Sequence, residues 1–80
     1  MKRYRTYRIE WMDAMVRPGW KDADADLSLI PNTSVGYMVK HDRNYVALAQ
    51  TIGHEDDALP FASTTSIPRG CIISMTRIGQ

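Results

Sequence analysis

The sequence predicts a small all-β fold, an antiparallel barrel of about five strands that forms one domain over residues 1–80. Three observations carry this prediction. Eighty residues suffice for one domain and leave it only a thin core. Apolar and polar side chains alternate over several short segments, and turn-forming residues separate those segments. A Pro-containing turn also precedes the last apolar segment, as expected for the connection into a final strand.

The first strand is expected at Tyr4–Met12. Tyr7, Ile9 and Trp11 share one face of it, which is typical of a half-buried strand. The other face carries Thr6, Arg8 and Glu10.

A long first loop follows, because the next twenty residues contain strong breakers instead of a second alternating segment. Pro18-Gly19 and Pro31-Asn32 bracket a run of alternating Asp and Ala. Trp20 is the aromatic residue of this loop, and we expect it to pin the loop to the barrel.

A hairpin is expected next. Val35, Tyr37 and Val39 alternate with Gly36, Met38 and Lys40, residues 41–44 supply turn chemistry, and residues 45–52 form the return strand.

The last part of the chain predicts a polar loop and two further strands. Gly53 ends the hairpin, a short strand ends near Ile67, and Pro68-Arg69-Gly70 turns the chain into a strand at residues 71–78. That final strand has apolar residues on both faces, so one face is expected to meet a second copy of the chain. The predicted oligomer interface consists of Cys71, Ile73 and Met75.

Composition is that of an ordinary globular protein, with 44% hydrophobic and 24% charged residues and a net charge of +1. No apolar run is long enough to span a membrane, and the first ten residues lack the apolar stretch of a secretory signal, so we expect no membrane partner and a cytoplasmic location. The single cysteine excludes an internal disulfide. Small domains without such a staple often self-associate, which favours a homo-oligomer.

Catalytic signatures are weak throughout, so no enzyme activity, metal or cofactor is expected. Asp22, Asp24 and Asp26 have the first spacings of a calcium loop, but Leu27 stands where glycine is needed. Residues 54–57, His-Glu-Asp-Asp, are not a helical zinc motif and are typical of a solvated loop. Cys71 would need a base beside it to act as a nucleophile, and at the start of an apolar strand it is more typical of a buried hydrophobe.

Binding features are better represented, in two candidate groups. The basic start combines Arg3, Arg5 and Arg8 with tyrosines, a combination that single-strand nucleic-acid binders use. The alternative is that these arginines keep an edge strand from aggregating. In the second group, the hairpin tip and the two long loops are expected to meet at one end of the barrel. The residues of this second group are Trp20, His41, Arg43, Tyr45 and Phe61.

Two resemblances bear on the fold and source. The strand layout is similar to the Sm-like and Src-homology-3-like small barrels, and Gly36, Met38 and Asp42 resemble the first Sm motif. The chain also resembles small uncharacterised bacteriophage and prophage proteins that share SVGY-V-D--Y--LAQ-I followed by IP-G-I-S---I. That second resemblance implies a phage accessory protein in a bacterial host, with a role such as anti-defence.

Two functional hypotheses follow. The first is a non-catalytic binding protein, a homo-oligomer that captures a host protein or a small anionic ligand such as a signalling nucleotide. The second is a nucleic-acid-binding module that uses the basic N-terminal strand. The near-neutral net charge favours the first, because nucleic-acid-binding domains are usually strongly basic.

Overall fold

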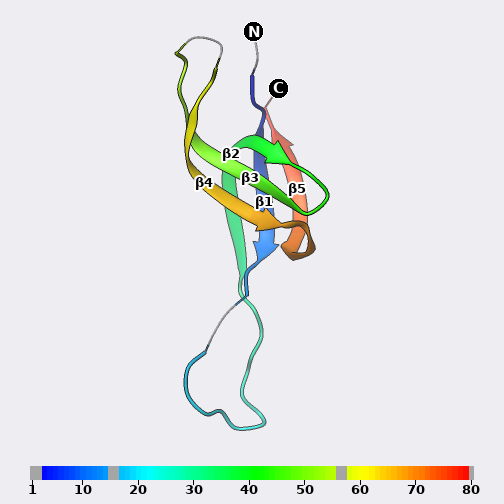
Figure 1. Ribbon diagram of the computed structural model, residues 1–80. Helices are drawn as coiled ribbons and strands as arrows, with labels where there is room; N and C mark the ends of the chain where they lie inside the picture. Colours follow the sequence, from blue (N-terminus) through cyan, green and yellow to red (C-terminus); the bar gives the residue numbers. More distant parts are fainter. Residues whose placement is uncertain (1–2, 15–16, 56–57, 80) are drawn as a thin grey trace.

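The computed structural model describes residues 3–14, 17–55 and 58–79 of the chain. Over these residues the chain forms five strands and one short 3-10 helix, η1 (Figure 1). The elements are β1 (Thr6–Met12), β2 (Pro31–His41), β3 (Tyr45–Ile52), β4 (Phe61–Pro68), η1 (Arg69–Cys71) and β5 (Ile72–Ile78).

All five strands belong to one antiparallel sheet in the order β4-β3-β2-β1-β5. The prediction of an all-β fold with about five antiparallel strands is therefore confirmed. The sheet is not closed, because β4 and β5 are its two outer strands and do not pair with each other. It is an open, strongly bent sheet, whereas the sequence predicts a barrel.

The bend lies within β2, whose two halves pair with different strands. Residues 31–37 pair with β1, and residues 37–41 pair with β3, so that Tyr37 alone has partners on both sides. The β2–β3 register shifts between Met38 and Lys40, which makes Val39 the extra residue of a bulge. Bulges of this kind bend a strand and increase its twist. As a result, β3 and β4 cross obliquely over β1 (Figure 1).

The core lies where these two parts of the sheet face each other. Ile9 of β1 is fully buried against Val46 and Leu48 of β3 and Ile67 of β4. Half-buried side chains surround this cluster: Tyr7, Trp11, Met38, Cys71 and Ile72. The predicted inward face of the first strand is thus confirmed, although the strand begins at Thr6 and not at Tyr4.

The indole of Trp11 is anchored at this core by a hydrogen bond, in which its Nε1 donates to the Ser34 hydroxyl at 3.0 Å. Tryptophan usually satisfies its N–H in this way when it is partly buried. The bond joins β1 to β2 beside the buried Ile9, which faces Ser34 in the register.

The face assignment predicted for the last strand is wrong in detail. The β1–β5 register shifts between Glu10 and Trp11, so that Trp11 lies opposite Ile72. Cys71 and Ile72 therefore both pack against the core although they are adjacent in the chain. Ile73, at the irregularity, is 55% exposed. Strict alternation fails here because Ile73 is the extra residue of a bulge between the pairs Glu10–Ser74 and Trp11–Ile72.

Residues 13–14 and 17–30 form no strand and extend beyond the sheet end at which Met12 pairs with Pro31. The part Arg17–Ile30 is called the arm below. With the arm, the molecule measures 57 × 23 × 21 Å (Figure 1). The expectation that Trp20 pins this loop to the sheet is wrong, because its side chain is fully exposed (102%). No helix in the described ranges is long and apolar enough to cross a membrane.

Local hydrogen bonds give the arm a defined shape. The Arg17 guanidinium donates from Nη1 to the Leu27 carbonyl at 3.3 Å and from Nη2 to the Ser28 carbonyl at 2.6 Å, which joins the two sides of the arm. The Asp26 carboxylate accepts a bond from the Ser28 amide at 3.0 Å, and this bond lowers the pKa of Asp26 below its ordinary value of 3.8. At the tip, the Ala25 amide donates to the Asp22 carbonyl.

Gly36 sits at the bend and is the position most sensitive to side-chain size. A Cβ atom there would lie 2.8 Å from the Ala49 carbonyl oxygen and 3.2 Å from the Leu48 Cβ. Gly36→Ala must therefore push β3 away from β2, and we expect it to reduce the free energy of unfolding by about 1–3 kcal/mol. Urea unfolding measures this change.

Gly70→Ala is the matched control, because a Cβ at Gly70 meets no atom within 4 Å. We expect the Gly70 variant to be neutral or slightly more stable than wild type. Equal stabilities of the two variants would contradict the close approach at Gly36.

Candidate functional site

The tip of the β2–β3 hairpin is a rigid turn built on Asp42. Its carboxylate accepts bonds from the Asn44 amide at 2.7 Å and the Tyr45 amide at 3.0 Å, and its own amide donates to the Tyr45 carbonyl. These amides hold the pKa of Asp42 below its ordinary value of 3.8, and the positive charges of Lys40 and Arg69 act in the same direction.

Arg69 fastens this turn to the connection between β4 and β5. Its side-chain Nε donates to the Asp42 carbonyl at 2.8 Å, and its backbone amide donates to the Asn44 carbonyl at 2.9 Å. Asp42 and Arg69 thus stabilise the hairpin turn through these hydrogen bonds. His41 and Arg43 remain exposed on either side of Asp42, whereas Tyr45 is half-buried.

The N-terminal segment Arg3–Arg5 precedes β1 and lies beside β2. The Met38 amide donates to the Arg5 carbonyl at 2.8 Å, next to the bulge in β2. The Tyr4 ring meets the Phe61 ring edge to face, with centroids 6.2 Å apart. Arg3 and Arg5 are exposed. Arg3 and Arg5 therefore flank a tyrosine whose ring contacts the first residue of β4.

A shallow apolar depression of about 240 Å³ lies beside Phe61. It is lined by Thr51, Gly53, Pro60, Phe61 and Ala62, at the point where β3 ends and β4 begins. The Gly53 amide donates to the Pro60 carbonyl at 2.6 Å and closes the loop between these strands. Nearby Leu59 is buried at a φ of 47°, the left-handed region, so its burial holds a strained backbone in place.

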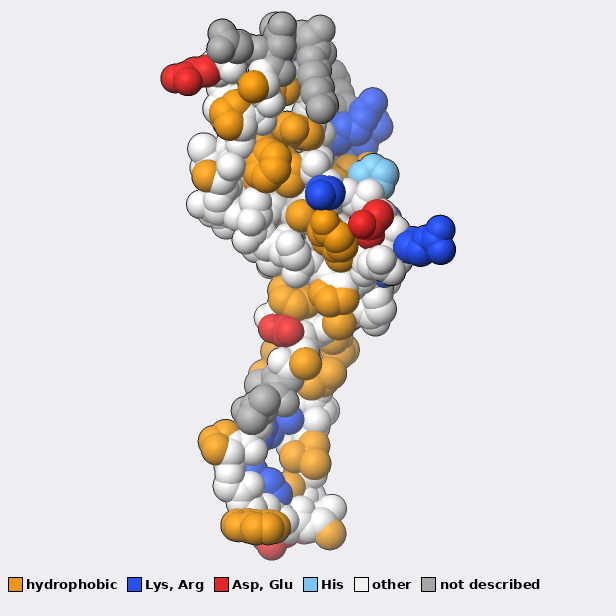
Figure 2. Space-filling view, viewed as in Figure 1, with side chains coloured by type: hydrophobic (Ala, Val, Ile, Leu, Met, Phe, Trp, Pro, Cys, Tyr) orange, Lys and Arg blue, Asp and Glu red, His pale blue; other side chains and the backbone are white. Residues whose placement is uncertain are grey.

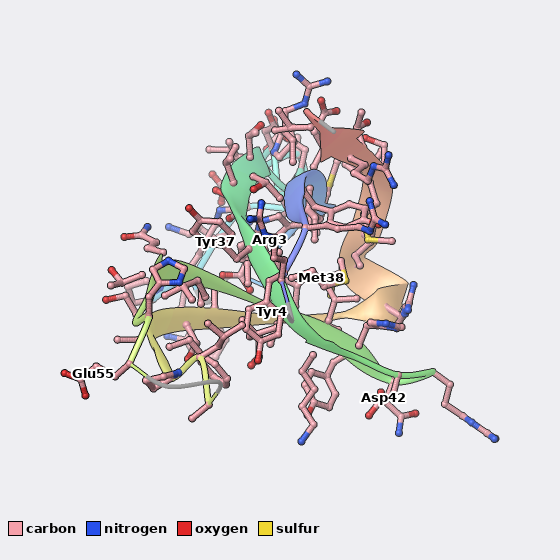
Figure 3. The ribbon with its side chains drawn as sticks, turned by 90° about the horizontal axis from the view of Figure 1, so that it is seen from above. Arg3, Tyr4, Tyr37, Met38, Asp42 and Glu55 are labelled. Atoms are coloured by element: carbon pink, nitrogen blue, oxygen red, sulfur yellow. The ribbon has the colours of Figure 1, made fainter. Side chains whose placement is uncertain are left out.

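The predicted second binding cluster does not assemble in one chain. Trp20 lies in the arm, and Phe61 pairs with Ile52 at one end of β3, while Tyr45 pairs with Pro68 at the other end. Figure 3 views the molecule from above, and there Asp42 of the hairpin tip and Glu55 of the β3–β4 loop project to opposite sides. The loops diverge because the bend in β2 turns β3 away from the axis of β1.

The basic residues also divide between surfaces. Arg8 lies opposite Val35 of β2 and Thr76 of β5, on the side of β1 that faces away from the core residue Ile9. Arg3 and Arg5 precede β1 near Phe61. A continuous basic stripe along the first strand, which the nucleic-acid hypothesis needs, is therefore not formed by these three arginines.

One exposed apolar surface was missed by sequence reasoning. We call it the outer face: the side of β2, β1 and β5 turned away from the core, with Arg8 near its centre. Its exposed residues are Arg8, Glu10, Thr33, Val35, Tyr37, Ser74, Thr76 and Ile78. The alternation in β2 is misleading at this point. Val35 and Tyr37 are the large apolar residues of the pattern and would be predicted to face the core, whereas the residue that faces the core is Gly36.

The predicted oligomer interface is partly occupied by the fold itself. Cys71 is half-buried and packs against the core, whereas Ile73 and Met75 of β5 are exposed. Elsewhere in the described chain, no three His, Cys, Asp or Glu side chains lie close enough to hold a metal ion. Asp56 and Asp57 of the acidic loop lie outside the described residues.

These features define a small all-β protein with an open five-stranded sheet and several exposed apolar surfaces. No protein-family model matches the chain, and neither a curated protein nor a solved structure matches it significantly.

The Asp42 turn predicts a pH-dependent contribution to stability. A lowered pKa in the folded state means that the ionised carboxylate stabilises the fold above about pH 4, and that this contribution is lost as the pH falls through the folded-state pKa. Asp42→Asn keeps an acceptor oxygen but removes the charge. We expect its urea midpoint to lie below that of wild type at neutral pH, and the gap to narrow below pH 3.8.

Asp24→Asn, in the arm, is the control, because Asp24 takes no part in the hairpin turn. If the urea midpoints of wild type and Asp42→Asn differ by the same amount at neutral pH and below pH 3.8, the charge on Asp42 does not stabilise the turn.

Proposed function

We propose that this protein acts without catalysis, by binding, and that its functional unit is a homo-oligomer. The observation that carries the proposal is the amount of apolar surface that one chain leaves exposed. Among the described residues ten large hydrophobic side chains are exposed, whereas seven hydrophobic residues are buried and the largest fully buried side chains are Ile9, Val46 and Ile67. Figure 2 shows apolar side chains along the arm as well as over the sheet.

Size scaling supports the same conclusion. A compact monomer of 9.1 kDa has an accessible surface of about 4,900 Å². This chain exposes 6395 Å², an excess of about 1,500 Å² over the scaling value. The Cα radius of gyration is 16.3 Å, against about 12 Å for a compact chain of this length. A standard protein–protein interface buries about 800 Å² per partner, so the excess is large enough for one.

The target we propose is a host protein or a small anionic ligand such as a signalling nucleotide. Arg3, Arg5 and Arg8 support the anionic ligand, because they are exposed and none of them is ion-paired with a described carboxylate. Guanidinium groups recognise phosphate through bidentate hydrogen bonds. The resemblance to phage proteins supports an anti-defence role in the cytoplasm of a bacterial host.

The finer fold assignment is part of this proposal. The strand order, with the fifth strand beside the first, agrees with the Sm-like and Src-homology-3-like barrels if such a barrel is opened between its fourth and fifth strands. This likeness concerns architecture and carries no function of its own.

Nucleic-acid binding remains the second hypothesis, motivated by the arginines at the start of the chain. The separation of Arg8 from Arg3 and Arg5 and the net charge of +1 weigh against it. The two hypotheses differ in salt dependence, because displacement of counterions from a phosphate backbone makes nucleic-acid affinity fall steeply with salt.

Native mass spectrometry of protein freshly purified from bacterial cells tests the proposal. We expect an oligomer, with a nucleotide-sized adduct if the target is a small anionic ligand, or with a retained host protein. The matched control is the same protein after mild denaturation and refolding, which retains the oligomer but loses a co-purified ligand. A bare monomer at micromolar concentration would overturn the oligomeric unit, and co-purified RNA or DNA would favour the second hypothesis.

A further inference from the structure

The arm has a defined shape and extends away from the sheet of its own chain (Figure 1). Arg17 joins its two sides, and the Asp26 and Asp22 turns fix its tip. Fixing a backbone costs about 1–2 kcal/mol per residue in entropy, which burial of apolar side chains normally offsets. In the arm this burial is missing, because its large apolar side chains are exposed: Trp20, Leu27, Leu29 and Ile30.

Charge separates the arm from the rest of the molecule. The arm contains three aspartates, Arg17 and Lys21, so two positive and three negative charges give it a net charge of −1. The whole chain has a net charge of +1, so the remaining residues carry +2. The outer face has Arg8 near its centre, between Val35 and Thr76. Glu10 lies two residues from Arg8 on the same face and balances its charge, so the two surfaces match through their exposed apolar side chains.

The two surfaces cannot meet within one chain, because the arm leaves the sheet at the Met12–Pro31 end and extends away from it (Figure 1). A second copy, turned end for end about a two-fold axis near that point, brings each arm alongside the sheet of its partner. Such a contact is self-complementary, so the assembly closes as a dimer.

We propose that two copies of this chain exchange arms, so that the arm of each docks on the outer face of the other. This inference rests on the proposed homo-oligomer and specifies its interface. Trp20 is the anchor, since exposed tryptophans that become buried are typical hot spots of protein interfaces. The surface in excess of a compact monomer, about 1,500 Å² per chain, exceeds what a standard dimer interface requires.

The test uses one variant on each side of the contact. Trp20→Ser removes the anchor at a fully exposed position, so it leaves the fold of the single chain unchanged. Val35→Glu places a negative charge on the outer face opposite the acidic arm. We expect each variant to raise the dimer dissociation constant by roughly 30-fold or more, measured by sedimentation equilibrium.

Ile73→Ser is the matched control. Ile73 is as exposed as Val35, at 55% against 51%, but lies in β5 beside Met75, in the interface predicted from sequence. The arm-exchange dimer is unchanged by this substitution. If Ile73→Ser dissociates the dimer and Trp20→Ser does not, the arm proposal is overturned and the β5 interface is supported.

A mixing experiment distinguishes arm exchange from any other use of the two surfaces. The Trp20→Ser chain retains an intact outer face, and the Val35→Glu chain retains an intact arm. Their heterodimer therefore keeps one of the two contacts, whereas each variant homodimer keeps none. We expect native mass spectrometry of the mixture to show heterodimer in excess over both homodimers.

The outcomes distinguish a failure of the arm exchange from a failure of the homo-oligomer. A wild-type dimer that Trp20→Ser leaves intact, or a mixture without excess heterodimer, overturns the arm exchange while the homo-oligomer stands. A monomeric wild-type chain overturns both. Should Val35→Glu fail to fold by circular dichroism, the Trp20→Ser and Ile73→Ser pair still decides the question.

Discussion

The bend of β2 is the constraint on which the rest of the structure depends. The strand pairs with β1 through residues 31–37 and with β3 through residues 37–41, and the close approach of Gly36 to Ala49 allows the change of direction. Because of this bend, β3 and β4 cross β1, and Ile9 can be buried against Leu48 and Ile67. A straight β2 would give a flat sheet with no enclosed core.

The same bend determines what the chain leaves uncovered. Folding β3 and β4 over one side of β1 covers that side and leaves the outer face, with Val35 and Tyr37, in solvent. The sheet also keeps two free edges, in β4 and β5, and unpaired edges are ready positions for another chain. The core is small and the exposed apolar surface is large. Together these features favour a protein whose apolar surface is covered by association, and they are the reason that we propose a function in binding.

Much of the fold could be predicted from sequence, because it depends on local signals. Alternation around Ile9 located β1, and the turn chemistry at Asp42 located the hairpin, whose return strand has the bounds expected. Pro68 and Gly70 marked the connection into β5. The predictions that were wrong concern long-range geometry. Closure of the sheet and the position of Trp20 both depend on the direction in which β2 bends, and no local pattern records that direction.

The candidate site shows the same division. Exposure of Arg3, Arg5 and Arg43 follows from their charge, whereas grouping of Trp20, Tyr45 and Phe61 required the loops to meet at one end.

We infer that a single chain does not complete its own apolar packing. The most direct test is the thermal unfolding midpoint over a roughly hundred-fold range of protein concentration, since association raises apparent stability by mass action. The account predicts a midpoint that rises steadily with concentration. A midpoint that does not change would show that the single chain is the complete folded unit.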